Sequence, residues 1–250
     1  MMTEVVIQKI NNTLNANSMA SYERDVGQSG AVWSTHGGEL TVEHVCQVMT
    51  EYIPNNILKD VDTIIDMGCG TGIVCAASAM LFRRKTIIGV DCSATRLQHL
   101  DALIDELHLR NERSVLGDWN INNYNDDKWE FMSVSGKTLF FCNNINFAND
   151  NTQDNMEALI SSRSNHGSMI LSYSTAFAAR GDITEVIWNQ AISFPRDHFS
   201  WATSNKTLTL TIHMLNKEKQ QNKGHHHTRR NSSPTLLYVS VNTRKHWARG

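Results

Sequence analysis

A chain of 250 residues with 40% hydrophobic content is long enough to bury one sizeable core, so we expect one domain with appendages. No apolar run reaches the roughly 18 residues of a membrane span. The first 20 residues are polar and rich in Asn and lack the apolar stretch of a signal peptide.

The net charge of −2 conceals an asymmetry. Residues 217–250 carry eight Lys or Arg and one Glu, a net +7, which leaves −9 for residues 1–216. A basic end on an acidic domain suggests a polyanionic partner, either nucleic acid or an acidic protein surface; a solvated tail without a partner is the alternative.

The cysteines indicate free thiols. None of Cys46, Cys69, Cys75, Cys92 and Cys142 forms a CxxC pair, which favours a reducing compartment over a disulfide framework. The histidine run 225–227 has no further ligands beside it, so we expect no metal site.

In chain order, hydrophobic periodicity predicts an irregular segment with a short helix, followed by alternating helices and strands. Pro54 ends the first periodic helix, and Ser93 is a candidate cap for a later one. The expected helices are 40–52, 73–82, 94–109 and 152–163, and the expected strands are 63–67, 86–90, 114–116, 137–142, 167–172, 186–192 and 207–214.

This alternation predicts an α/β fold, a doubly wound Rossmann-like sheet with a small N-terminal helical or loop segment. We expect three parts: an N-terminal segment at 1–55, a core at 56–215, and a basic tail at 216–250 whose low apolar content favours disorder.

A glycine-rich turn follows the first expected strand of the core. Residues 66–72 read Asp-Met-Gly-Cys-Gly-Thr-Gly, and the next strand ends at Asp91, nineteen residues past Gly72. Glycines permit a tight turn and close approach to a ligand, and an acid after the second strand accepts hydrogen bonds from ribose hydroxyls. The pattern therefore predicts an adenosyl cofactor held by Gly68, Gly70, Gly72 and Asp91.

Asp66, two residues before the first glycine, suits a cationic, amino-acid-bearing cofactor better than a pyrophosphate. The loop resembles the first motif of class I S-adenosylmethionine methyltransferases. Ligands in open α/β sheets bind beyond the carboxyl ends of strands, which adds Asp118 for the adenine amino group and Trp119 for its ring.

Residues 139–148 read Leu-Phe-Phe-Cys-Asn-Asn-Ile-Asn-Phe-Ala. This run resembles the signature of the non-SET histone-lysine methyltransferases, the disruptor-of-telomeric-silencing family, in which two asparagines precede Phe-Ala-Phe. Further runs resemble that family in order: 37–39, 117–119, 167–172 and 199–201. The chain departs from it at Ile145, where the family has Phe, and at Leu208 and Thr209, where the family has two tyrosines.

The resemblance implies a seven-stranded methyltransferase sheet, S-adenosylmethionine as cofactor, and a lysine in the globular core of nucleosomal histone H3 as substrate. It implies that Glu39 lies in a loop over the cofactor, that Asn144 orients cofactor or amine, and that Phe147 and Trp201 line the lysine channel. It also implies a nuclear protein whose basic tail contacts DNA; the residues concerned are Lys217, Lys219, Lys223, Arg229 and Arg230.

Two alternatives remain open on sequence. One is a class I methyltransferase acting on RNA or a small molecule. The other is a chromatin-binding pseudoenzyme that keeps the fold, which the absent tyrosines at 208 and 209 allow.

Overall fold

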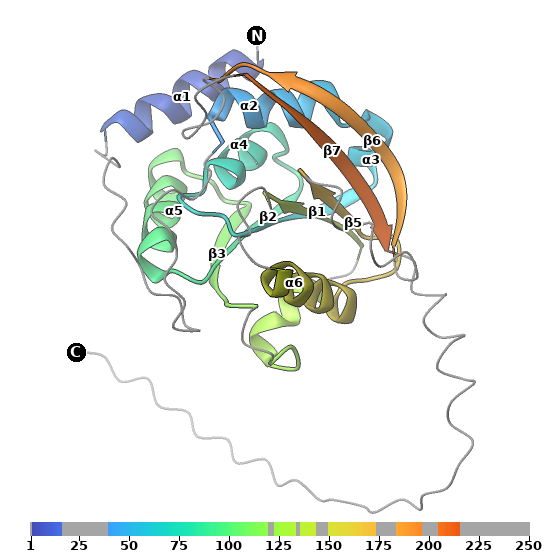
Figure 1. Ribbon diagram of the computed structural model, residues 1–250. Helices are drawn as coiled ribbons and strands as arrows, with labels where there is room; N and C mark the ends of the chain where they lie inside the picture. The colour runs from blue at the N-terminus through green and yellow to red at the C-terminus, as the bar shows by residue number, and fades with distance from the viewer. Residues whose placement is uncertain are drawn as a thin grey trace, which may run out of the picture.

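The structure, a computed structural model, describes residues 2–16, 40–119, 123–133, 136–143, 150–173, 184–196 and 205–215. In this part of the chain one sheet separates two layers of helices (Figure 1). The α/β, doubly wound Rossmann-like fold expected from the sequence is confirmed.

The sheet has seven strands in the order β3-β2-β1-β4-β5-β7-β6. Strands β1 to β5 are parallel, whereas β7 runs antiparallel to both β5 and β6. The strand bounds are β1 Val61–Met67, β2 Thr86–Asp91, β3 Glu112–Leu116, β4 Lys137–Cys142, β5 Met169–Ser172, β6 Thr184–Phe194 and β7 Lys206–Leu215. The central strands read as apolar runs because both of their faces are covered.

The helices form a layer on each face. One face carries α1, α2, α4 and α5, whose apolar side chains share a core cluster with Ile64, Phe141 and Leu171. The other face carries η2 and α6, which pack around Ile65 and Phe140. The bounds are α1 Met2–Ala16, α2 Val42–Gln47, η1 Val48–Tyr52, α3 Asn55–Lys59, α4 Ile73–Leu81, α5 Ala94–Leu107, η2 Asp127–Ser133 and α6 Asp150–Arg163.

Two parts of the N-terminal region differ from the sequence expectation. The short helix expected there is the 15-residue helix α1, which buries Val6 and Ile10 in the core. The single helix expected at 40–52 is an α-helix that widens into the π-helix η1 after Gln47. At this junction the Thr50 hydroxyl donates to the Cys46 carbonyl (2.8 Å), a side-chain bond that competes with the helical ladder.

Polar side chains cap the helices that flank the sheet. The Ser93 hydroxyl accepts from the Arg96 amide at 3.2 Å and begins α5, as the sequence predicted. Thr41 does the same for α2. Helix α5 ends at His108, which adopts a left-handed conformation with φ of 54°.

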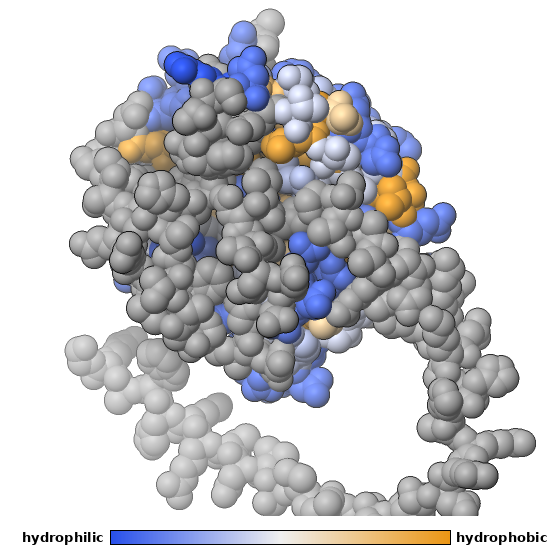
Figure 2. Space-filling model, in the orientation of Figure 1, coloured by the Kyte–Doolittle hydropathy of each residue, from blue (hydrophilic) through white to orange (hydrophobic). Residues whose placement is uncertain are grey.

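The surface of the described residues is mixed. Figure 2 shows hydrophobic residues as separate patches among hydrophilic ones on the visible face. The large apolar side chains most exposed to solvent are Val5, Leu116, Val186 and Ile187. Within the described residues, no helix combines the length and the apolar character that crossing a bilayer requires.

Candidate cofactor-binding site

The chemistry-bearing residues meet at one edge of the sheet. Strands β1, β2, β3 and β4 are parallel, so their carboxyl ends lie together. The chain order reverses between β1 and β4, because β1 pairs with β2 on one side and with β4 on the other. Such a switch point is where open α/β sheets bind ligands.

The glycine-rich loop at this edge depends on glycine at three positions. Gly68, Gly70 and Gly72 have φ values of 85°, 55° and 90°, which side-chain-bearing residues rarely adopt. The amides of Gly68 and Cys69 donate to the Val90 carbonyl at 2.8 and 3.0 Å, which ties the loop to β2. Gly72 then begins α4 in a left-handed conformation.

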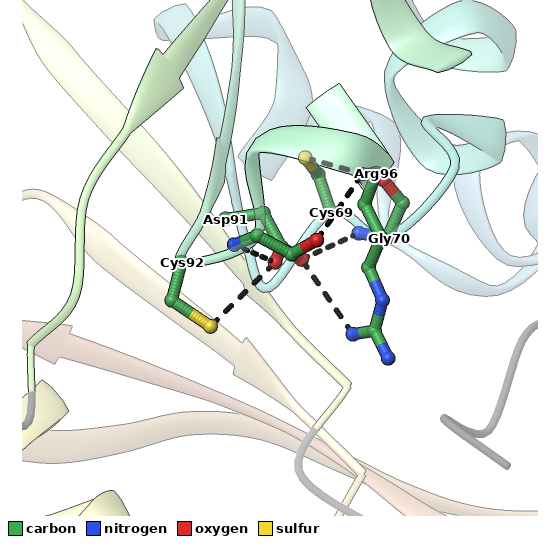
Figure 3. Close-up of polar contacts among 6 residues, drawn as sticks. Cys69, Gly70, Asp91, Cys92 and Arg96 are labelled. Carbon is green, nitrogen blue, oxygen red and sulfur yellow. Dashed lines mark hydrogen bonds and ion pairs between the residues drawn. The ribbon is translucent and has the colours of Figure 1, made fainter. Parts of the chain in front are cut away.

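Asp91 lies at the end of β2 and faces this loop (Figure 3). Its Oδ2 accepts from the Gly70 amide at 3.0 Å and lies 4.0 Å from Nη1 of Arg96. Its Oδ1 accepts from the Ser93 amide at 2.9 Å. Burial raises the pKa of Asp91, and the guanidinium and the two amides oppose that rise. Asp91 is therefore a buried carboxylate that these donors support in its charged form.

The surroundings of Asp66, at the end of β1, stabilise a charged carboxylate less well than those of Asp91. Asp66 is 2% exposed, and its Oδ2 lies 3.7 Å from Sγ of Cys75, a weak donor. Burial, followed by the charge of Asp91, raises the pKa of Asp66 to about 8. The loop thus holds two interacting carboxylates, one with strong donors and one with a thiol.

Asp118 and Trp119 follow β3 at the same edge, and both are buried. The Gly117 amide donates to the Asp91 carbonyl at 2.9 Å, which holds this turn beside β2. The Trp119 ring comes within 3.5 Å of the point where a Cβ on Gly68 would lie. The sequence-selected residues 66–72, 91, 118 and 119 therefore occupy one region, although contacts with adenine stay predictions.

The acceptor-side residues lie outside the described part of the chain. These are Glu39, Asn144, Phe147 and Trp201, together with the basic tail. Of the run 139–148, the structure describes the part in strand β4 and Asn143, which follows β4 at the carboxyl edge of the sheet. The predicted roles of the acceptor-side residues stay predictions.

Sequence reasoning missed three residues near the edge. Arg96 lies beside Asp91, and its position in the first turn after the Ser93 cap was the available signal. His44 of α2 and Tyr173, directly after β5, form a buried hydrogen bond of 2.9 Å between Nε2 and Oη. No local pattern joins two residues this far apart in sequence.

The other potentially reactive groups do not form a second centre. All five cysteines are buried, and burial raises the pKa of Cys69 to about 12, so these thiols stay protonated at neutral pH. No group of three His, Cys, Asp or Glu suited to a metal ion occurs within the described residues.

Comparison with known proteins supports a methyltransferase. Residues 28–125 match the family of protein-L-isoaspartate(D-aspartate) O-methyltransferases, a match that covers the glycine-rich loop, Asp91, Asp118 and Trp119 but less than half of the chain. Comparison with curated proteins gives no match.

Solved structures are similar at low identity. One, from a study of the conversion of a disulfide bond into a thioacetal group during echinomycin biosynthesis, has 14% identity and a TM-score of 0.50, covering 71% of this chain and 88% of that one. An rRNA methylase from Streptococcus thermophilus has 12% identity and a TM-score of 0.40, covering 63% and 88%. A precorrin-6y C5,15-methyltransferase from Geobacter metallireducens has 12% identity and a TM-score of 0.44, covering 71% and 91%. Only the first reaches 0.5, and it bears on the fold alone.

The fold, the site and the partial family match are those expected of class I methyltransferases, whose methyl donor is S-adenosylmethionine. Within that class, residues 28–125 are similar to the isoaspartate O-methyltransferase family. This match supports methyl transfer without supporting histone-lysine specificity.

Proposed function

We propose that this protein transfers a methyl group from S-adenosylmethionine to a lysine amine in the globular core of histone H3 within nucleosomes. The observation that carries the proposal is the run 139–148, which resembles the signature of the non-SET histone-lysine methyltransferases. Strand β4 brings the start of this run to the edge that also bears Asp66 and Asp91.

The described residues fit the cofactor. A carboxylate has about four lone-pair sites, and Asp91 uses three of them, two strongly for the Gly70 and Ser93 amides and one weakly for the Cys92 thiol, which still leaves an acceptor for a ribose hydroxyl. Among the described residues, the hydrogen-bond donor to Asp66 is the Cys75 thiol, so a cationic group there would replace a poor partner with a good one. Glycine at 68 and 70 lets a ligand approach the loop backbone closely.

When bound, S-adenosylmethionine supplies an electrophilic methyl group on a sulfonium. The acceptor amine must be neutral to attack, whereas a free lysine has a pKa of about 10.4. An apolar channel lowers that pKa by desolvation, and we assign Phe147 and Trp201 to its walls and Asn144 to orientation. No side chain stands out as a dedicated base, so in-line positioning and desolvation provide the acceleration.

The basic tail provides a contact to nucleosomal DNA in this proposal. Its net charge of +7 over residues 217–250 would displace counterions from phosphates, so nucleosome binding should weaken steeply with salt. This role places the protein in the nucleus. Replacing Lys217, Lys219, Lys223, Arg229 and Arg230 by Gln should weaken nucleosome binding and leave cofactor binding unchanged.

A second candidate rests on the family match, which favours methylation of a protein carboxylate. The two reactions leave different products, because a methyl ester is hydrolysed at alkaline pH and an N-methyl amine is not. Alkaline lability of the transferred label therefore separates them.

The test uses cofactor labelled on its methyl group, offered with nucleosomes, free histones, an isoaspartyl peptide and RNA. We expect alkali-stable label on H3 in nucleosomes, and none with an Asp91→Asn variant, which weakens the ribose contact. Label on RNA alone, or alkali-labile label on protein, would refute the lysine proposal. A protein that binds no S-adenosylmethionine in calorimetry would be a pseudoenzyme.

A further inference from the structure

A buried hydrogen bond joins the helical layer to the carboxyl edge of the sheet at the end of β5. Nε2 of His44, on α2, lies 2.9 Å from Oη of Tyr173, the residue after β5. His44 is fully buried and Tyr173 is 3% exposed. A polar pair in such surroundings is held firmly, because breaking the bond would leave polar atoms without water.

The parallel register shows where this pair lies. Cys142 of β4 pairs with Ser172 of β5, so Asn143 and Tyr173 are the next positions at the same level of the carboxyl edge. Asn143 belongs to the run 139–148 on which the proposed acceptor side rests, directly before Asn144. The pair thus lies level with Asn143, the last described residue before the proposed acceptor side, whereas the glycine-rich loop, Asp91 and Asp118 follow β1, β2 and β3.

Rings around the pair fix its geometry. The centroid of the His44 ring lies 5.6 Å from that of Tyr173 and 4.3 Å from that of Phe194, at the end of β6. Tyr173 also contacts Phe141 of β4, at 5.8 Å between centroids. Residues from β4, β6 and α2, together with Tyr173 after β5, therefore pack around this hydrogen bond. Burial, followed by the charge of Asp66, holds the pKa of Tyr173 well above its ordinary value, so this hydroxyl keeps its proton.

We propose that the His44–Tyr173 hydrogen bond positions the acceptor end of the methyl-transfer site by locking α2 and the end of β5 beside Asn143. Neither residue is assigned a role by the family match or by any motif in the sequence. The inference rests on the proposed methyltransferase function, but not on which acceptor is used. Displacing a reacting group by about 1 Å can cost about 100-fold in rate, so a lock of this kind affects methyl transfer more than cofactor affinity.

The chain offers a matched control. Tyr52, in η1, belongs to the same ring cluster, with its ring edge-on to Phe194 at 5.6 Å between centroids. Tyr52 is partly buried, whereas Tyr173 is buried. Tyr173→Phe removes the hydroxyl of the lock, whereas Tyr52→Phe removes a hydroxyl from the same cluster and leaves the lock intact. Both keep the ring, so both variants should fold.

The experiment measures two ligands by calorimetry. S-adenosylhomocysteine occupies the cofactor site without a transferable group, and sinefungin places an amine where the methyl group would be. Tyr173→Phe should weaken sinefungin about tenfold and leave S-adenosylhomocysteine within about twofold. Tyr52→Phe should change neither. His44→Gln, which can still bond the hydroxyl, should fall between wild type and Tyr173→Phe.

Each result bears on the inference. An unchanged ratio of the two affinities in Tyr173→Phe overturns it, as does equal weakening of both ligands, which would indicate general loosening. On the acceptor that the labelling assay identifies, Tyr173→Phe should lower kcat per cofactor-binding site at unchanged KM for S-adenosylmethionine. A wild-type protein that binds neither ligand refutes the proposed function itself, an outcome distinct from an unchanged ratio.

Discussion

Cofactor binding should depend on pH through the Asp66 carboxyl, and the Asp66→Asn variant tests this dependence. The Asp66 carboxyl has a pKa of about 8, because it is buried and close to the charge of Asp91, while the Cys75 thiol, its donor among the described residues, is weak. At neutral pH it therefore carries a proton. A cofactor with a sulfonium and an ammonium favours the ionised form, so binding should release that proton.

The size of the effect follows from the pKa. A proton lost on binding makes the association constant rise tenfold per pH unit below the pKa of the free site. With that pKa at about 8, and with the carboxyl ionised throughout this range in the complex, affinity should increase about 30-fold between about pH 5.5 and pH 7. The cofactor's own ammonium stays charged across this window, so the slope reports the protein.

Calorimetry of S-adenosylmethionine binding, in buffers of different ionisation enthalpy, measures both the slope and the proton released. In Asp66→Asn most of the slope and the released proton should disappear. The pKa of Asp91 is also raised by burial, and Asp91 is present in both proteins, so a slope that remains in Asp66→Asn reports Asp91. Flat affinity in the wild type, or the same slope in the variant, would show that Asp66 is ionised before the cofactor arrives.

Three further predictions concern stability and reactivity. Gly72→Ala should lower the free energy of unfolding by about 1–4 kcal/mol in urea, because φ is 90° and the new Cβ would lie 2.5 Å from Cδ1 of Leu100; an unchanged midpoint would contradict this. Burial raises the pKa of Glu112 from 4.5 to about 8, so the folded state holds this proton more tightly than the unfolded state does. The free energy of unfolding should therefore fall as pH rises through this interval. Glu112→Gln should show a shallower fall, and an equally steep fall would argue against the shift. Because all five cysteines are buried, a thiol reagent should modify none within minutes until denaturant is added; rapid modification of the native protein would show that a thiol is exposed.

The sequence was sufficient where local patterns coincide with local structure. Residues 66–72 place glycines where φ must be positive, and the strands on both sides are buried apolar runs, so loop, strands and Asp91 could be located without coordinates. Strand β4 was predicted with its observed bounds, 137–142, for the same reason.

The remainder depends on contacts between distant segments. Helix α1 is polar over most of its surface, and Val6 and Ile10 mark a buried face only once α2, α4 and α5 are in place. His44 and Tyr173 are 129 residues apart, and no residue next to either of them in the sequence indicates that they form a hydrogen bond. The high pKa of Asp66 likewise follows from burial and from Asp91, which no pattern near Asp66 records.

The Leu100 side chain couples the glycine-rich loop to helix α5. Its Cδ1 presses toward Gly72 and its Cδ2 toward Gly89, at 2.5 and 2.4 Å from where a Cβ would stand. Because the Leu100 side chain packs so closely against both glycines, it must move whenever the glycine-rich turn moves. The order that a nucleoside imposes on the turn should therefore pass along α5, and slower amide exchange in the later turns of that helix would report that the cofactor site is occupied.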